Sequence, residues 1–173
     1  PYEYHLLGMM GDKIGEGIPV FTGLPKVITP EALRNLGAQL NTSGAYGMYH
    51  ILGFTPEAPT LEVAFGGKKP EREVVITDKD LRDFEEKFSD ELPNGGKIDF
   101  AMFGCPHFTL EEAKYIAEHV EGKKLSVPMY ILVSSHALQM AERMGIYDTL
   151  AAAGAELISD SCPDQPCWHY LKG

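Results

Sequence analysis

Three similar stretches decide the fold: KIDFAMFGCPHFTLEE at residues 97–112, VPMYILVSSH at residues 127–136 and AELISDSCP at residues 155–163. Each stretch begins with a short apolar run, and sulfur-bearing or polar residues follow that run. Helical patterns fill the two intervals and end at Gly122 and Gly154. Strands that alternate with helices in units of about 30 residues predict a parallel, or mostly parallel, sheet with crossover helices, which is an α/β fold.

The pattern also predicts where the elements of this second half lie. We expect strands at residues 97–103, 127–133 and 155–159, with Cys105-Pro106-His107 in a turn after the first strand. Thr109 and Glu112 have the spacing of a capping box, so a helix should begin after Thr109 and run to about residue 121. A second helix should begin after Ser134-Ser135, and a third, shorter helix should occupy residues 146–153.

The first half of the chain is less regular. We expect a helix over residues 2–10, a strand over 18–21, a helix that begins at Thr29-Pro30, and a strand over 44–54 around His50. Residues 71–91 carry nine acids against four bases, and their apolar residues recur at helical spacing. This segment should form an amphipathic helix whose charged side faces water.

Composition limits the classes of function. At 173 residues, 44% of them hydrophobic, the chain can bury a core, and we treat residues 1–173 as a single α/β region. The chain starts without Met and stops at Gly173, so we expect it to be a fragment of a longer polypeptide. The net charge of -10 disfavours nucleic acid as a partner. We expect no membrane association, since no apolar run approaches the roughly 20 residues that a bilayer requires and no leader is visible.

The three cysteines are an odd number and a poor basis for a disulfide framework. A reducing compartment suits them better, so we expect a cytoplasmic protein. Cys105 and Cys162 each follow a predicted strand and precede a proline, and Ser134-Ser135 follow the strand between them. The carboxyl ends of parallel strands meet at one edge of a sheet. These three loops should therefore line one crevice.

The residues leave four interpretations of this crevice open. The cysteines can be buried apolar residues, which free cysteines usually are. Zinc can bind Cys105, Cys162 and Cys167 with His107 or His169 as the fourth ligand. An iron–sulfur cluster can use the three cysteines and leave one iron open as a Lewis acid. Finally, His107 can activate Cys105 as a nucleophile, although residues two apart in a proline turn rarely point at each other.

Several blocks of the sequence resemble one family. Residues 104–112 (GCPHFTLEE), Ser134-Ser135, residues 151–155 (AAAGA) and residues 160–163 (DSCP) are similar to the aconitase X family of hydro-lyases. The upstream blocks YHLLG at residues 4–8, IPVFTGLP at 18–25, TSG at 42–44 and GFTPEA at 53–58 agree in type and order. The resemblance spans the whole chain, which corresponds to less than half of a full catalytic subunit, and it implies an aconitase-like α/β domain.

The resemblance implies a dehydratase that removes water from a small hydroxy acid, such as cis-3-hydroxy-L-proline or mevalonate 5-phosphate. The implied cofactor is an iron–sulfur cluster (4Fe-4S or 2Fe-2S) or a mononuclear iron. By carry-over, Cys105 and Cys162 are metal ligands, and Cys167 is the weaker third candidate. Ser134, Ser135 and His107 are the catalytic candidates, and the two serines would hold the substrate carboxylate.

The resemblance also implies a partner. Family members carry a small swivelling domain, either fused or as a separate subunit, and we expect the general base there because residues 1–173 offer no convincing one. The isolated fragment should then be inactive. The rival interpretation is a zinc-binding or thiol-sensing module without chemistry of its own.

Overall fold

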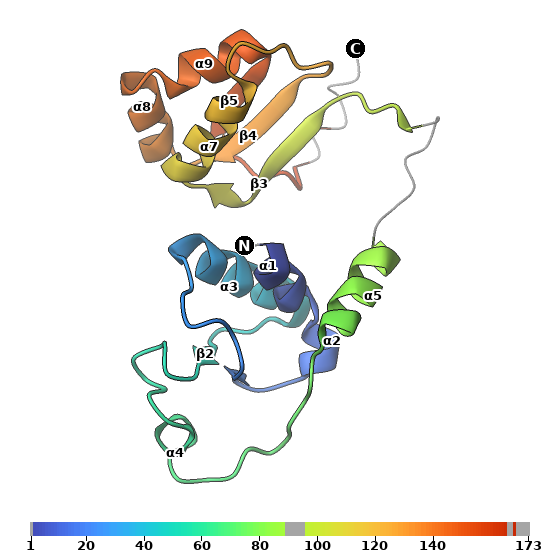
Figure 1. Cartoon of the computed structure of the whole chain (residues 1–173), viewed down its shortest axis with the longest axis vertical. Helices are drawn as coiled ribbons and strands as arrows, with labels where there is room; N and C mark the ends of the chain where they lie inside the picture. Colours follow the sequence, from blue (N-terminus) through green and yellow to red (C-terminus); the bar gives the residue numbers. More distant parts are fainter. Residues whose placement is uncertain (1, 89–95, 166–167, 169–173) are drawn as a thin grey trace. The chain divides into compact units, whose positions relative to one another are not determined.

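The computed structural model describes residues 2–88, 96–165 and 168 (Figure 1). The chain forms two compact units, Pro1–Asp90 and Glu91–Gly173, where the sequence analysis treats residues 1–173 as one region. Each unit has its own hydrophobic core, and the two cores share no described residue. Two cores form because the apolar side chains on either side of the acidic segment bury against neighbours from their own half of the chain. Each unit is described by itself.

The first unit is mainly helical. Its elements are α1 (Tyr2–Met9), α2 (Gly11–Ile14), β1 (Val20–Phe21), α3 (Pro30–Gly44), β2 (His50–Ile51), α4 (Leu61–Ala64) and α5 (Asp78–Phe88). α3 is central, since Leu36 and Leu40 on it are completely buried. α1 lies close against α3. A Cβ added to Gly8 of α1 would lie only 2.8 Å from the Leu36 carbonyl oxygen of α3.

The start of α3 confirms its prediction. The Thr29 hydroxyl accepts a hydrogen bond from the Ala32 amide at 3.2 Å, and Pro30 occupies the first turn. The predicted strands of this half are shorter than expected. β1 and β2 pair in parallel over only two residues each. A strand that begins at Gly44 is wrong, because α3 extends to Gly44 and Ala45 then caps it in the left-handed conformation, with φ of 54°.

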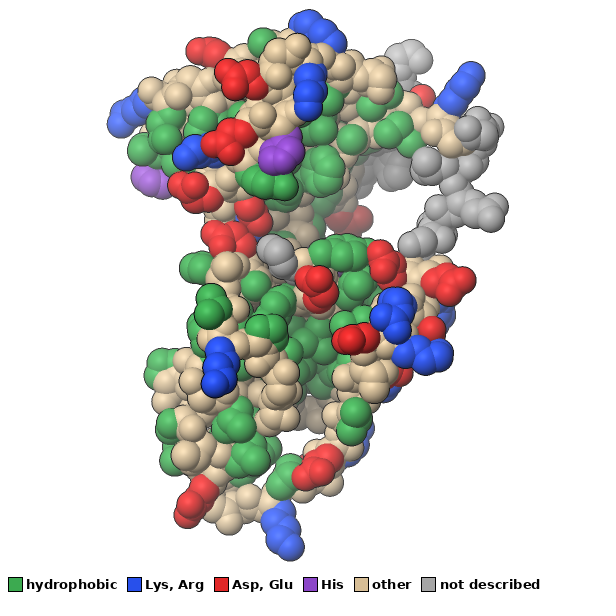
Figure 2. Space-filling model, in the orientation of Figure 1, with side chains coloured by type: hydrophobic (Ala, Val, Ile, Leu, Met, Phe, Trp, Pro, Cys, Tyr) green, Lys and Arg blue, Asp and Glu red, His purple; other side chains and the backbone are tan. Residues whose placement is uncertain are grey.

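The acidic segment also forms a shorter helix than predicted. α5 starts at Asp78, and the Asp80 carboxylate accepts hydrogen bonds from the amide and the hydroxyl of Thr77, both at 2.7 Å. Lys13 forms an ion pair with the same carboxylate. Hydrogen bonds from Lys13 and Thr77 hold the pKa of Asp80 well below its usual range. Acidic and basic side chains are interspersed on the visible surface of this unit (Figure 2).

The second unit confirms the α/β class. β3 (Ala101–Phe108), β4 (Met129–Val133) and β5 (Ala155–Ser159) form a parallel sheet in that order. α7 (Leu110–Val120) connects β3 to β4, and α8 (Ser135–Arg143) and α9 (Ile146–Ala153) connect β4 to β5. Ile131 and Val133 of β4 are buried in one cluster with residues of these three helices. Because side chains alternate along a strand, Tyr130 and Leu132 lie on the opposite face of the sheet.

The helix boundaries follow their local signals. The Thr109 hydroxyl accepts a hydrogen bond from the Glu112 amide at 3.2 Å, and the Glu112 carboxylate accepts one from the Thr109 amide at 2.9 Å. This reciprocal pair is the predicted capping box. α9 ends at Gly154 in the left-handed conformation. Within the described ranges, no helix is both long and apolar enough to cross a membrane.

Candidate functional site

The candidate site lies at the carboxyl edge of the sheet β3-β4-β5. The register places Phe108 opposite Val133, and Val133 opposite Ser159, so the three strands end at the same level. The predicted strand at 97–103 with a turn after it is wrong in its bounds. β3 begins at Ala101 and continues through Cys105, Pro106 and His107.

A large β-bulge explains why the bounds of β3 differ from the predicted ones. Phe103 is paired with Ile131 and Phe108 with Val133, so five steps along β3 correspond to two steps along β4. The inserted residues loop out of the ladder and rejoin it, which a strand prediction from local pattern does not anticipate. The result is that Cys105, inside the bulge, is exposed at the edge of the sheet.

Gly104 permits the bulge. Its φ is +142°, and a Cβ at this position would lie 2.3 Å from the Cβ of Leu132. Leu132 is completely buried, so it has no room to withdraw. A glycine is therefore required immediately before Cys105, where the backbone of β3 lies against Leu132 of β4.

His107 is anchored to the segment that follows β5. Its Nε2–H donates a hydrogen bond to the carbonyl oxygen of Ser161 at 2.5 Å. The half-buried ring thus joins the bulge of β3 to the segment after β5. With the proton on Nε2, the Nδ1 atom is the ring nitrogen that can serve as a ligand or base.

The two serines lie at the start of α8. The Ser134 hydroxyl accepts a hydrogen bond from the Ala137 amide at 3.2 Å and is the N-cap. The Ser135 amide donates to Oδ1 of Asp160 at 3.0 Å. Two of the N-terminal amides of α8 are therefore already bonded within the protein, whereas the Ser135 side chain is exposed. A role for these serines in holding a substrate carboxylate stays a prediction.

Cys162 is exposed just beyond β5. Its carbonyl oxygen accepts hydrogen bonds from the Trp168 indole N–H at 2.7 Å and from the Gln165 amide at 3.2 Å. Cys167 and His169, the other candidate ligands, lie outside the described residues. Among the residues that the structure describes, no group of three or more His, Cys, Asp or Glu side chains is arranged to hold a metal ion.

The chemistry of the edge fits part of a metal site. Two thiols, which are ligands for iron and zinc, are exposed here, that of Cys105 on the bulge of β3 and that of Cys162 just beyond β5, and β4 lies between these two strands. Hydrogen bonds of the His107 ring and of the Cys162 carbonyl oxygen join the two segments to the chain around them. The interpretation of Cys105 and Cys162 as buried apolar residues is wrong, since both are exposed. The ligand assignments of Cys105, Cys162 and Cys167 and the catalytic role of His107 stay predictions.

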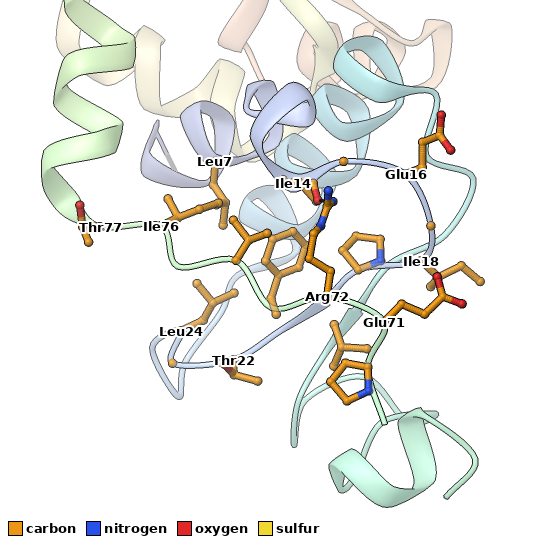
Figure 3. A pocket seen from close by; sticks show the side chains of 18 of the residues that line it. Leu7, Ile14, Glu16, Ile18, Thr22, Leu24, Glu71, Arg72, Ile76 and Thr77 are labelled. Atoms are coloured by element: carbon orange, nitrogen blue, oxygen red, sulfur yellow. Dashed lines mark hydrogen bonds between the residues drawn. The ribbon is translucent and has the colours of Figure 1, made fainter. Parts of the chain in front are cut away.

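A separate cavity of about 1320 Å³ lies within Pro1–Asp90 (Figure 3). Leu7, Ile14, Leu24 and Ile76 give it apolar walls, and the Arg72 guanidinium, which also lines it, donates a hydrogen bond to the Ile14 carbonyl oxygen. None of the predicted site residues lines this cavity. The cavity was not predicted, because its walls combine α1, α2, β1 and residues 65–81, which are distant in the chain and show no common local pattern.

The chain is similar to known proteins over most of its length. Residues 1–86 match the family model described as aconitase X second domain, and residues 98–172 match the model of the aconitase X third domain. A cis-3-hydroxy-L-proline dehydratase from Pseudomonas aeruginosa is 36% identical over 165 residues, which is 92% of this chain and 28% of the relative. A phosphomevalonate dehydratase large subunit from Thermococcus kodakarensis is 32% identical over 163 residues, or 92% of this chain and 40% of the relative.

A solved structure agrees with these sequence matches. The crystal structure of Thermococcus kodakaraensis aconitase X in its holo form superimposes with a TM-score of 0.78 at 32% identity. The match covers 92% of this chain and 40% of that chain. The chain therefore spans less than half the length of the relatives named here.

Proposed function

The chain belongs to the aconitase X family, and from this premise we propose that the full-length polypeptide is a hydro-lyase that removes water from a small hydroxy acid. Relatives named as dehydratases of cis-3-hydroxy-L-proline and of phosphomevalonate support this reaction class. The observation that carries the proposal is that the bulge of β3, the start of α8 and the segment after β5 lie at one edge of the sheet, where Cys105 and Cys162 are exposed.

Cys105 and Cys162 would hold an iron or iron–sulfur centre, with Cys167 as the third ligand. When bound, such a centre supplies a Lewis acid for the departing hydroxyl group. Thiols at an edge loop suit this task, because they can bind the metal on one side and leave its other side open to substrate. Exposed thiol ligands also suit a reducing compartment such as the cytoplasm.

The remaining polar groups of the edge have different tasks. The exposed Ser135 hydroxyl can donate a hydrogen bond to the substrate carboxylate, close to the positive end of α8. His107 keeps the bulge of β3 against Ser161 through its Nε2–H. The proton next to the carboxylate is removed by a general base of the small swivelling domain, fused or separate, so residues 1–173 alone are inactive.

Exposed apolar side chains support the need for further protein around the first unit. Val27 is 84% exposed and Val75 is 77% exposed, and Figure 2 shows hydrophobic side chains on the visible surface of Pro1–Asp90. Exposed apolar side chains of this kind are compatible with a surface that other protein covers. A swivelling domain is one partner that such a surface can accommodate.

The test uses the full-length polypeptide with its small subunit or domain, prepared under anaerobic conditions. Wild type should contain iron, show iron–sulfur or iron–thiolate absorption, and dehydrate one of the two hydroxy acids. Cys105→Ser and Cys162→Ser should each lose iron and activity. The control is Ser126→Ala, which alters an exposed residue before β4 at the opposite edge of the sheet and should keep both. Full iron content in both cysteine variants, or stoichiometric zinc without dehydration, would contradict the proposal.

A further inference from the structure

Asp160 occupies an unusual backbone position directly before the Cys162 turn. Its φ is +52°, in the left-handed region that residues with a Cβ adopt at a cost. Among the described non-glycine residues, positive φ occurs at Asp160 and at Ala45. Aspartate and asparagine tolerate this region better than most residues. The backbone therefore turns sharply here, between the last residue of β5 and the exposed Cys162.

Two hydrogen bonds tie Asp160 to the junction of β4 and α8. Its amide donates to the Val133 carbonyl oxygen at 2.9 Å, and its carboxylate accepts from the Ser135 amide at 3.0 Å. The partners are the last residue of β4 and the first residue of α8, and both lie 25 or more residues away in the chain. The loop after β5 is thus fixed to the loop after β4 through one residue.

The carboxylate bond is not needed to begin α8. Ser134 already caps this helix through the Ala137 amide, with extended backbone of φ −75° and ψ 154°. Asp160 adds a link between two loops, and its negative charge at the positive end of the helix strengthens that link. The next residue is linked as well, since the Ser161 carbonyl oxygen accepts the hydrogen bond of His107.

We propose that Asp160 is a positioning residue for Cys162: its carboxylate, bonded to the start of α8, sets the turn that brings the Cys162 thiol to the sheet edge that carries Cys105. The metal-binding consequence rests on the proposed function. The positioning role extends it, because Asp160 itself is assigned neither to the metal nor to the substrate. Residues that orient metal ligands from behind commonly change metal affinity without binding the metal.

The test titrates the metal-free full-length protein with Co²⁺ alone and follows thiolate-to-cobalt absorption. Asp160→Gly relieves the backbone strain but removes the carboxylate, and we expect it to weaken Co²⁺ binding about tenfold or more. Asp160→Asn keeps an acceptor oxygen and the tolerance for left-handed backbone, so it should restore affinity to near the wild-type value. Circular dichroism and the hydrogen exchange of β4 and α9 check that each variant is folded.

A second variant breaks the same hydrogen bond from its other end. Ser135→Pro removes the donor amide at the first position of α8, where proline is well tolerated and where Ser134 is already extended. Ser135→Pro should weaken Co²⁺ binding by about the same factor as Asp160→Gly. It therefore tests the hydrogen bond independently if Asp160→Gly folds poorly. Wild-type affinity in Ser135→Pro would overturn the proposal, and so would an Asp160→Asn variant as weak as Asp160→Gly.

Cys162→Ser separates this proposal from the function on which it rests. If Cys162→Ser binds Co²⁺ as wild type does, the ligand assignment in the proposed function fails. If Cys162→Ser loses Co²⁺ while Asp160→Gly and Ser135→Pro retain it fully, Cys162 is a ligand and only the positioning role of Asp160 is refuted.

Discussion

Gly104→Ala tests the close approach on which the exposed Cys105 loop depends. The new Cβ would lie 2.3 Å from the Leu132 Cβ and 3.0 Å from the Leu132 Cα. Leu132 cannot move outward, because it is completely buried and belongs to the central strand of the sheet. The variant must therefore either displace β3 from β4 or compress the core.

The expected cost has two parts. Forcing an extra methyl into a tightly packed position costs about 1–3 kcal/mol. A Cβ on a residue with positive φ costs about 1–2 kcal/mol more. Gly122→Ala is the control for a Cβ at positive φ without a clash, because Gly122 has φ of +70° and no atom within 4 Å of the added Cβ. Compared with Gly122→Ala, Gly104→Ala should lower the free energy of local unfolding by about 1–3 kcal/mol more. This difference corresponds to about a 5-fold to 140-fold increase in the equilibrium constant for local opening of β3 and β4.

Hydrogen exchange of the β3 and β4 peptides in the full-length protein measures this opening directly. Gly104→Ala should lose protection in both strands, whereas Gly122→Ala should lose less and mainly around the end of α7. If the two variants lose the same protection in β4, then Gly104 does not lie against Leu132 as described, and the structural reason for the bulge is wrong.

Two further changes test local features of each unit. Thr109→Ala removes the N-cap of α7 and should cost about 1 kcal/mol in unfolding free energy, seen as faster amide exchange at the start of the helix, while Thr109→Ser keeps the hydroxyl and should be near neutral. Asp80→Asn removes a carboxylate whose pKa is held well below its usual range by hydrogen bonds from Lys13 and Thr77. The stabilising contribution of Asp80 is therefore present above about pH 4 and lost as the pH falls toward the lower pKa of the folded state. The stability difference between wild type and variant, from denaturant unfolding, should shrink in acid, and a difference that does not change with pH would count against this ion pair.

The sequence predicted those parts of the fold that are determined locally. β5 has the predicted bounds, and the capping box at Thr109 and the cap at Gly154 lie where residue type and spacing place them. Each of these features depends on residues within a few positions of one another. The alternation of such elements was enough to establish the parallel sheet and the edge where its loops meet.

The features that the sequence missed depend on distant partners. The two-residue length of β1 and β2 is set by pairing between segments 30 residues apart. The bulge of β3 requires the contact of Gly104 with Leu132, which no local pattern reveals. Asp160 was visible as part of DSCP, but its bond to Ser135 emerges only when β4 and β5 lie side by side. The sequence offered two signals for these features, a glycine before a cysteine and an aspartate after a strand. Each of these signals has several common structural explanations.

The polar groups of the sheet edge divide into two sets by what they contact. His107, Ser134 and Asp160 each make a hydrogen bond to backbone within the protein, and together these bonds join the loops after all three strands. Cys105 and Cys162 are both exposed, one on the bulge that Gly104 permits and one two residues beyond the turn at Asp160. A site that binds a metal needs ligands that face outward and a rigid frame that limits their movement. Because Asp160 and His107 fix the segment after β5 through their hydrogen bonds to backbone, replacing Cys162 should remove a proposed ligand without loosening that segment, whereas replacing Asp160 should loosen the segment without removing a proposed ligand.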